Sequence, residues 1–444
     1  MTRRTGSLLS LLLFAIFATV TSSAAEAKFR AGATRIDVTP SQQELPKPYT
    51  SVFDPIYARV IVVENGAARL VLASVDSATI SNNYPADLAA RIAKEANVPV
   101  ENVMLATTHA HDSIRISNVP GTTAVPFSMA FNAKVEAALV DATRQSIAKL
   151  QPARIGFGRG KAYINGNRMY WDPEQGRYML GYDRSGTLPS DKTVYVVKFE
   201  SLSGEPIAFF VNYALMPIVH TTGSYSGGDD RLGGDVPGAT SQYAEKALGE
   251  KAVVIMTMGG GDQHPIYRVD RHGPEAQQYS ESLIRTYSQI LGEEILATSK
   301  DIRNTIDQGQ IYAAGKDLTC PGKLTTPIND PSRCSNKPDS KLPPCGVYKE
   351  EDAPPVTFGI NLLVVGDIAF AAVSEDVGTT MVQRVQASSP YRNTVVISRI
   401  FGPARYLVTD DMYGLYTFDS TDSHAKKGCA EKSIVSGFLD LMPK

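Results

Sequence analysis

The chain has 444 residues, with 44 Lys and Arg against 46 Asp and Glu, a net charge of −2 and a pI near 6.3. This balance offers neither a basic surface for nucleic acid nor a polybasic segment for an anionic membrane, which argues against both classes of partner. A chain of this length is large enough to bury most of its apolar surface. The oligomeric state does not follow from the sequence.

The N-terminal residues 1–27 have the pattern of a secretory signal peptide. Arg3 and Arg4 precede an apolar run at residues 8–20, which is too short to span a membrane comfortably, and Ala25-Glu26-Ala27 forms a small-residue cleavage motif. An uncleaved membrane anchor is the alternative, but the flanking residues suit cleavage better. We therefore expect an exported protein, periplasmic or secreted, that begins at Lys28 and has no membrane-spanning segment.

Strand-like and helix-like segments alternate along the chain. A strand pattern at residues 29–38 ends at Thr39-Pro40, and Asn65-Gly66 between two β-rich runs predicts a hairpin. A helix at residues 85–96 would place Leu88, Ile92 and Ala93 on one face. Further strands are predicted at residues 193–200, 206–211, 252–258 and 362–373, and helices at 133–149, 240–248, 274–299 and 377–387. This order predicts a mixed α/β (α+β) fold, with central mixed β-sheets flanked by helices.

Residues 317–355 interrupt this alternation with a segment rich in Pro, Asp and Lys. It contains Cys320, Cys334 and Cys345, and Cys429 lies near the C-terminus. Because exported compartments oxidise thiols, we expect an irregular surface loop stapled by disulfides, with three pairings possible. Zinc binding by these cysteines is disfavoured, since no C-x-x-C pair is present.

The most informative motif is a His-x-His pair at the end of an apolar run. His109 and His111 follow the run that starts at Val103. Residues i and i+2 point to the same side of a strand, so two imidazoles would project together. Metal ligation or proton transfer is the indicated chemistry, and a pair of surface histidines without a function is the alternative.

Two other loops carry polar side chains after apolar strands. Three glycines at residues 259–261 precede Asp262 and His264, so the backbone there can approach a ligand closely, although a simple tight turn has the same composition. Glu375 follows the apolar residues 368–373, where a carboxylate can ligate a metal, accept a proton or cap a helix. Imidazoles and a carboxylate with an open water position make up a zinc environment.

Taken in order, these motifs resemble the catalytic N-terminal domain of the neutral and alkaline, non-lysosomal ceramidases, zinc amidases that cleave the N-acyl bond of ceramide. The matches are short, but they keep one order along most of the chain. They comprise the opening strand at residues 31–40, the T-H-x-H-S loop at 108–113, the Asn-Arg pair at 167–168, the G-D-V-S-P loop at 261–265, the P-G-E-x-T-T-M segment at 374–381, the segment at 394–409 that ends in the zinc-binding tyrosine, and a second active-site tyrosine near residue 416.

The resemblance implies a single zinc-dependent hydrolase domain at residues 28–444 that cleaves an amide bond in a small amide or lipid. It implies one zinc ion whose bound water has a pKa near 7 and attacks the carbonyl, His111 as the proton shuttle, and Tyr416 with Arg168 as stabilisers of the oxyanion. The implied metal ligands are His109, His220, Glu375 and Tyr406; the catalytic residues are His111, Arg168, His264 and Tyr416; and the substrate-binding residues are Asn167, Gly261 and Asp262. Acidic loops leave open an additional structural Ca2+ or Mg2+.

Two positions depart from the family pattern. The family's second zinc histidine precedes a proline, whereas here Met216 precedes Pro217, and a thioether is a poor zinc ligand. We expect His220 to reach the metal instead. His264 occupies the position of the family's serine, which removes a serine nucleophile but is compatible with zinc-bound hydroxide. A smaller amide or an ester is therefore as good a candidate as ceramide, and we expect no immunoglobulin-like domain such as longer members carry.

Two alternatives to this interpretation remain. A TIM-barrel amidohydrolase or another metal-dependent esterase would also carry His-x-His at a strand end, but several elements precede His109, whereas those enzymes place the pair on the first barrel strand. A relative that kept the fold and lost the chemistry would be an exported binding protein, and Met216 and His264 favour that class. Metal content distinguishes the silent relative from either hydrolase, because only the hydrolases need stoichiometric zinc.

Overall fold

The computed structural model describes residues 28–443 except 48, 67, 82–83, 118–128, 220–229, 270–272, 327–333, 347 and 400. The signal-peptide prediction for residues 1–27 and the expected ligand His220 fall outside the described residues. Among the residues that are described, no helix has the length and apolar character needed to cross a membrane.

A 13-stranded mixed sheet runs through the whole protein. Its neighbours are antiparallel except for three parallel pairs, β13 with β15, β20 with β22 and β4 with β6. The strand order is β18 (Ile311–Thr326), β19 (Lys349–Val365), β20 (Ile368–Val373), β22 (Asn393–Ser398), β15 (Val253–Met258), β13 (Pro206–Tyr213), β12 (Thr193–Ser201), β8 (Gln151–Lys161), β1 (Arg30–Asp37), β3 (Tyr57–Glu64), β4 (Arg69–Val75) and β6 (Val103–Thr107), with β17 (Thr305–Ile306) beside β8.

The sheet folds over so that two halves face each other. We call β1, β3, β4 and β6 the first half, and the strands from β8 to β18 the second half. In the part of the chain that the structure describes, the ladder between the halves consists of two residue pairs of β1 and β8. Ile61 and Val63 of the first half share one inner core with Phe210 and Phe370 of the second half, whereas Val62 belongs to a cluster on the outer face. This alternation follows from the two-residue period of a strand.

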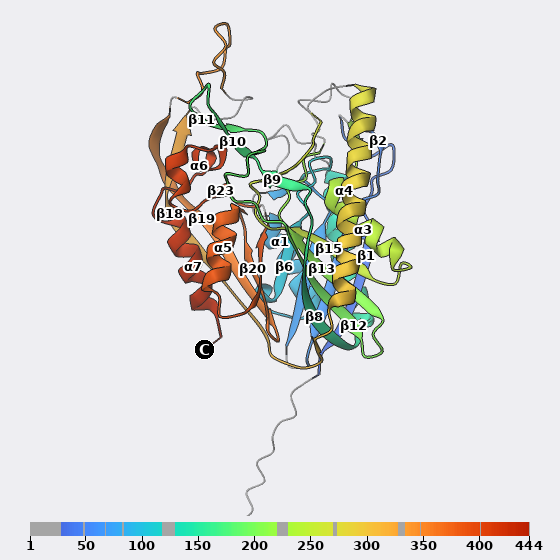
Figure 1. The fold of residues 1–444 in the computed structure, drawn as a ribbon. Coiled ribbons are helices and arrows are strands. Elements are labelled where there is room, and N and C mark those ends of the chain that lie inside the picture. The colour runs from blue at the N-terminus through green and yellow to red at the C-terminus, as the bar shows by residue number, and fades with distance from the viewer. Residues whose placement is uncertain are drawn as a thin grey trace, which may run out of the picture.

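Helices cover both outer faces of the folded sheet (Figure 1). Apolar side chains of α1 (Tyr84–Ala96) and α2 (Met129–Ala148) pack on the first half. On the second half, α3 (Asp235–Ala247) and α4 (Pro274–Asp301) cover β12, β13 and β15, while α5 (Thr379–Ser388) and α7 (Ala430–Leu441) cover β19, β20 and β22. The result is a layered arrangement of helices, sheet, sheet and helices, which confirms the predicted mixed α/β class.

Shorter elements connect these layers and carry several site residues. The remaining elements are β2 (Tyr49–Val52), β5 (Ile80–Ser81), η1 (Val100–Asn102), β7 (Ile116–Ser117), β9 (Asn165–Asn167), β10 (Met169–Asp172), β11 (Arg177–Leu180), β14 (Asp230–Leu232), β16 (Gln263–Pro265), β21 (Asp376–Val377), β23 (Tyr406–Leu407), η2 (Met412–Leu415) and α6 (Phe418–Asp422). Two small ladders matter most for the site, β9 with β16 and β21 with β23.

Several local predictions are confirmed. The helix α1 buries Leu88, Ile92 and Ala93, as the apolar spacing predicted. The strands β3 and β4 form the hairpin expected at Asn65-Gly66, and Gly66 has a φ of 80°, a conformation that favours glycine. The helices predicted at residues 133–149, 240–248, 274–299 and 377–387 correspond to α2, α3, α4 and α5.

Two predictions about residues 317–373 are wrong. The single strand expected at residues 362–373 is a hairpin of β19 and β20, which turns at Gly366 with a φ of 60°. The segment expected to be an irregular loop begins and ends in an antiparallel ladder, because β18 and β19 pair from Ile311 to Thr326, whereas residues 334–346 form no helix or strand. The part of this ladder at residues 317–326 and 349–357 is mostly exposed, so most of its side chains are polar. A register shift beside Cys320 accommodates Pro321. The polar composition of these strands therefore resembles that of a loop.

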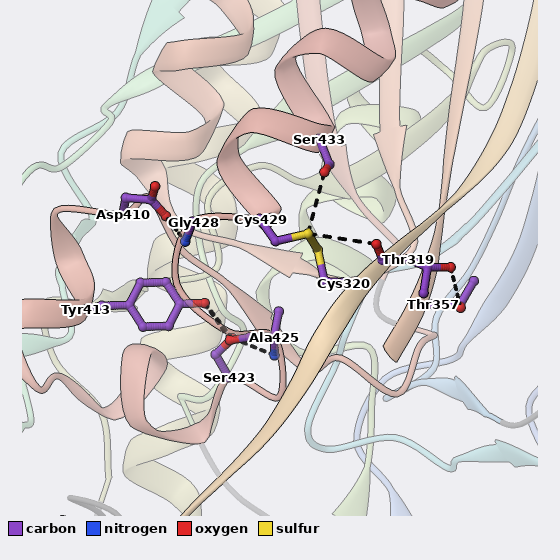
Figure 2. Close-up of a disulfide and its surroundings, with 10 residues drawn as sticks. All are labelled: Thr319, Cys320, Thr357, Asp410, Tyr413, Ser423, Ala425, Gly428, Cys429 and Ser433. Carbon is purple, nitrogen blue, oxygen red and sulfur yellow. Dashed lines mark hydrogen bonds between the residues drawn. A yellow bond between two sulfur atoms is a disulfide. The ribbon is translucent and has the colours of Figure 1, made fainter. Parts of the chain in front are cut away.

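The expected disulfides are present, and the structure decides their pairing. Cys320 of β18 is bonded to Cys429, the residue before α7, and Cys334 is bonded to Cys345 (Figure 2 shows the first). The backbone N–H of Lys426 donates to the carbonyl of Pro321 at 2.9 Å, so the C-terminal segment runs beside β18 and brings Cys429 to Cys320.

Candidate functional site

A cavity of about 300 Å³ lies between segments that follow strands of the two halves of the sheet. It is lined by Thr79, Ser81, His109, Arg115, Glu375, Asp376, Phe401, Gly402, Arg405, Tyr406 and Asp422. Three of the four expected metal ligands, His109, Glu375 and Tyr406, are among these residues. The structure thus brings together three side chains that are far apart in the sequence.

Each of these side chains is positioned by the end of a strand or by a short ladder. His109 follows β6 of the first half, and Glu375 follows β20 of the second half. Tyr406 begins β23, which pairs in parallel with β21 so that Tyr406 is the register partner of Asp376. Polar side chains at the carboxyl ends of buried strands are the usual place for chemistry in α/β proteins.

The two histidines of the His-x-His motif contact each other directly after the end of β6. Their Nε2 atoms are 3.1 Å apart, with ring centroids at 4.8 Å. His109 has a φ of 59°, a left-handed conformation that is uncommon for a non-glycine residue and is often found at functional sites. Burial, followed by the charges of Arg168 and Arg268, lowers the pKa of His111 to about 4. Burial also lowers the pKa of His109 well below its usual value, so both imidazoles are neutral at pH 7.

Two adjacent carboxylates are buried in the cavity wall. Among the described residues, Glu375 Oε1 and Asp376 Oδ2 have no hydrogen-bond partner. Burial raises the pKa of Glu375 to about 8 and that of Asp376 well above its usual value. A Cβ atom at Gly402 would lie 1.7 Å from Glu375 Oε1, and one at Gly261 would lie 1.8 Å from Asp376 Oδ1. Both glycines are therefore required for the carboxylates to fit.

These donors suit a divalent cation chemically. Imidazole nitrogen, carboxylate oxygen and phenolic oxygen are ligand types that zinc accepts, and an unpartnered buried carboxylate oxygen is costly unless a cation or a proton satisfies it. Within the described residues, no group of three or more His, Cys, Asp and Glu side chains is arranged to hold a metal ion. The expected set includes Tyr406, which is outside those residue types, and His220, which is outside the described residues.

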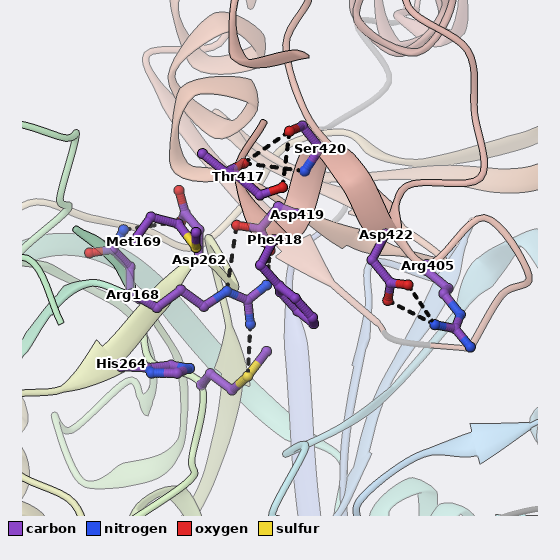
Figure 3. A network of polar contacts seen from close by, with 12 residues as sticks. Arg168, Met169, Asp262, His264, Arg405, Thr417, Phe418, Asp419, Ser420 and Asp422 are labelled. Carbon is purple, nitrogen blue, oxygen red and sulfur yellow. Dashed lines mark hydrogen bonds and ion pairs between the residues drawn. The ribbon is translucent and has the colours of Figure 1, made fainter. Parts of the chain in front are cut away.

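Arg168 is the charged centre of the neighbouring network (Figure 3). Its buried guanidinium donates to Asp419 of α6, lies 3.1 Å from Met216 Sδ, and stacks over the rings of Tyr406 and Phe418 at 4.7 and 5.1 Å. Burial alone lowers the pKa of Arg168, but the charges of Asp419, Tyr406 and Asp376, with the hydrogen bond to Asp419, together outweigh burial and raise this pKa above its usual value. The side chain is a permanent cation beside Tyr406, and the thioether of Met216 faces it.

Asn167 and Asp262 form a rigid support next to this network. Asn167 Nδ2 donates to Asp262 Oδ2 at 3.2 Å, and Asp262 Oδ1 accepts from the backbone and hydroxyl of Thr379 at 3.0 and 2.6 Å. The backbone N–H of Arg168 donates to the carbonyl of Asp262 at 2.8 Å. These contacts tie β9 and β16 to α5. The substrate-binding role expected for Asn167, Gly261 and Asp262 stays a prediction.

The other two expected catalytic residues are placed differently. His264 is buried in β16, where Nδ1 lies 3.2 Å from the carbonyl of Gly181 and 3.4 Å from Arg268 Nη1. Burial, followed by the charge of Arg168, lowers its pKa well below the usual value. Tyr416 is 52% exposed, stacks on Tyr348 at 4.8 Å, and does not line the cavity. The catalytic roles of His264 and Tyr416 stay predictions.

Some residues of the site were not found from the sequence. Asp419 pairs with Arg168, and Asp422 of the same short helix accepts two hydrogen bonds from Arg405 at 2.8 and 2.9 Å. Asp376 follows the predicted ligand Glu375 directly, so the acidic pair was a visible signal. The acidic residues of α6 carry no comparable pattern, because a five-residue helix is too short to show a period.

Comparison with known proteins supports the fold. No protein-family model matches the chain, and no curated protein matches it in sequence. Among solved structures, a ceramidase complexed with C2 has a TM-score of 0.72 at 16% identity, covering 94% of this chain and 75% of that chain. The neutral ceramidase from Pseudomonas aeruginosa has a TM-score of 0.69 at 15% identity, covering 94% and 74%. The chain therefore has a ceramidase-like fold.

Proposed function

We propose that this protein is a zinc-dependent hydrolase that cleaves an amide (N-acyl) bond in a small amide or lipid. The observation that carries the proposal is that His109, Glu375 and Tyr406, from three distant segments, line one cavity. The similarity in fold to two ceramidases supports amide hydrolysis as the reaction class. The expected fourth ligand, His220, belongs to the same proposal.

The residues of the chain have defined parts in this reaction. Bound zinc would supply a water of lowered pKa and polarise the carbonyl oxygen. His111 is neutral at pH 7, so its imidazole can accept a proton from the attacking water and return it to the leaving nitrogen. The fixed positive charge of Arg168 favours the developing oxyanion. In total, the water oxygen bonds to the carbonyl carbon, the C–N bond breaks, and the nitrogen leaves as an amine.

We also propose that the protein acts after export, as one domain over residues 28–444. Its four cysteines form two disulfides, which persist mainly in oxidising compartments. The N-terminal pattern of basic, apolar and small residues is consistent with this location. A binding protein without hydrolytic activity is the second candidate, because Met216 faces Arg168 and His264 replaces a serine.

Elemental analysis of the purified mature protein, combined with assays on N-acyl amides and esters, tests the proposal. We expect about one zinc per chain, and His109→Ala and Glu375→Ala should each lose that zinc and the hydrolytic activity while remaining folded. Glu205→Ala is the matched control, because this carboxylate is 69% exposed and lies 4.0 Å from Lys251. A hydrolase whose metal content is unchanged in both variants would show that the ligand assignment is wrong.

Absence of zinc and of activity from the unaltered protein would favour the binding protein. Calcium or magnesium in the same analysis would reveal a structural cation.

A further inference from the structure

A second cavity, of about 610 Å³, adjoins the cavity of the proposed reaction centre. Phe401 and Gly402 line both spaces. A Cβ atom at Gly402 would lie 1.7 Å from Glu375 Oε1, so this part of the shared wall is backbone that touches an expected zinc ligand. Ser374, the residue before Glu375, lines the second cavity as well. The second cavity therefore begins directly beside the proposed reaction centre.

Both end strands of the folded sheet line this second cavity, which we call the seam cavity. The first half contributes residues of α1 and η1 and Leu105 of the end strand β6. The second half contributes residues of the end strand β18, of β19 and of the segment after β22. Asn361 Nδ2 of β19 donates to the carbonyl of Glu101 of η1 at 2.9 Å, which joins the two halves in the wall. The seam cavity is thus built from both halves, as the proposed reaction centre is.

Most side chains of the seam cavity are apolar. They include Ala86 and Ala89 of α1, Val100 of η1, Leu105 of β6, Ile360 of β19 and Phe401. Val100 is 49% exposed, although it is a large apolar residue. The volume lies within the range of ligand-binding cavities, roughly 300–1,000 Å³. Because each methylene group that leaves water for an apolar lining favours binding, the seam cavity is suited to a hydrocarbon chain.

The charged side chains of the seam cavity balance one another. Glu101 and Asp317 are acidic, and Lys316 and Arg399 are basic. Lys316 Nζ lies 2.9 Å from Asp440 Oδ2, so this cation has a counterion of its own. An anionic ligand would meet two carboxylates, and a cationic ligand would meet two cations. The lining therefore favours a ligand portion without charge.

We propose that the seam cavity binds the acyl chain of the substrate as an uncharged hydrocarbon, so that the protein prefers medium- and long-chain amides to acetamides. This inference rests on the proposed amide hydrolysis and specifies the acyl portion of its substrate. With the carbonyl carbon at the reaction centre, the chain passes Gly402 and lies between α1 and the hairpin of β18 and β19. The small side chains of Ala86 and Ala89 leave room for it, so these residues determine selectivity for acyl length.

Substrates that differ only in acyl length test this inference. We expect kcat/KM to rise from N-acetylethanolamine to N-octanoylethanolamine, by up to about 4-fold for each methylene group that leaves water. Ala86→Trp and Val100→Trp each place a large ring in the seam cavity from an exposed position. Each variant should lower kcat/KM for the octanoyl substrate by at least about 10-fold, the effect of displacing roughly two methylene groups, and leave the acetyl substrate nearly unchanged.

The matched control is Ala90→Trp, because this exposed residue belongs to α1 but does not line the seam cavity. Unchanged activity on the acetyl substrate also shows that a variant is folded. Equal losses for both substrates in Ala86→Trp and Val100→Trp, or a preference of the unaltered protein for the acetyl substrate, would overturn the inference.

Calorimetric titration separates this inference from the proposed function. N-octanoylethanolamine should bind His109→Ala saturably and with a negative heat-capacity change, N-acetylethanolamine should not, and the addition of Ala86→Trp should weaken the binding. If the unaltered protein binds the octanoyl compound in this way but cleaves no amide, the seam cavity is retained and the hydrolase is refuted. Cleavage that does not depend on acyl length retains the hydrolase and refutes the role of the seam cavity.

Discussion

Arg168 is a buried charge that contacts residues from segments far apart in the sequence. It donates to Asp419, contacts the thioether of Met216, and stacks on Tyr406 and Phe418. A buried ion pair adds little net stability over apolar packing, but the loss of one partner leaves the other charge uncompensated. The pair therefore specifies one arrangement of the cavity wall.

We predict that Asp419→Ala lowers the free energy of unfolding by about 3–5 kcal/mol, because it leaves the guanidinium of Arg168 buried without a counterion. Urea unfolding followed by circular dichroism measures the change. The control is Asp440→Ala, which removes an exposed partner of Lys316 at 2.9 Å and should cost under about 1 kcal/mol. Similar losses in the two variants would contradict the assigned role of Asp419.

At the scale of elements, the C-terminal helix is attached to the sheet by both packing and a covalent bond. The apolar face of α7 contacts β18 and β19, with Ile434 and Phe438 buried. The bond between Cys320 and Cys429 spans 109 residues, whereas the bond between Cys334 and Cys345 spans 11. A disulfide stabilises chiefly by restricting the unfolded chain, so the longer loop should contribute more.

We predict that Cys320→Ser with Cys429→Ser destabilises the protein by about 5 kcal/mol, and Cys334→Ser with Cys345→Ser by about 3 kcal/mol, from loop entropy alone. Thermal unfolding of the two double variants under oxidising conditions gives the comparison. The ranking is the test: if the short-loop variant were the less stable of the two, restriction of the unfolded chain would not be the main contribution of these bonds.

At the scale of the whole molecule, the proposed reaction centre depends on the contact between the two halves of the sheet. His109 comes from the end of β6 in the first half, and Glu375 from the end of β20 in the second. The shared inner core holds these strand ends together, because Ile61 and Val63 of the first half lie in one cluster with Phe210 and Phe370 of the second half.

We predict that Phe370→Ala destabilises the whole protein by about 3–5 kcal/mol, because it opens a cavity in the core that both halves share. The fluorescence of Trp171 and far-ultraviolet circular dichroism should report the same unfolding midpoint, shifted together. Tyr279→Ala, at an aromatic residue of α4 that is 46% exposed, should leave the midpoint nearly unchanged. Separate midpoints for the two probes would show that the halves unfold independently.

Local order was readable from the sequence because it depends on residues close together in the chain. The spacing of Leu88 and Ile92 specified a helix face, and Asn65-Gly66 specified a hairpin, since turn chemistry and apolar period act over a few residues. The sequence also predicted that the imidazoles of His109 and His111 lie together, and their Nε2 atoms are 3.1 Å apart. Both residues follow the end of β6, however, and His109 has a φ of 59°, so a turn and not strand alternation brings them together.

Tertiary structure alone decided which distant residues meet. The ion pair between Arg168 and Asp419, the orientation of Met216 toward Arg168 and the bond between Cys320 and Cys429 each join segments whose contact no local pattern encodes. The exposed part of the ladder of β18 and β19 resembled a loop in its composition, because a strand that buries few side chains carries few apolar residues. Periodicity records which side of an element is buried, whereas the identity of its neighbour is set only when the two halves of the sheet close on their common core.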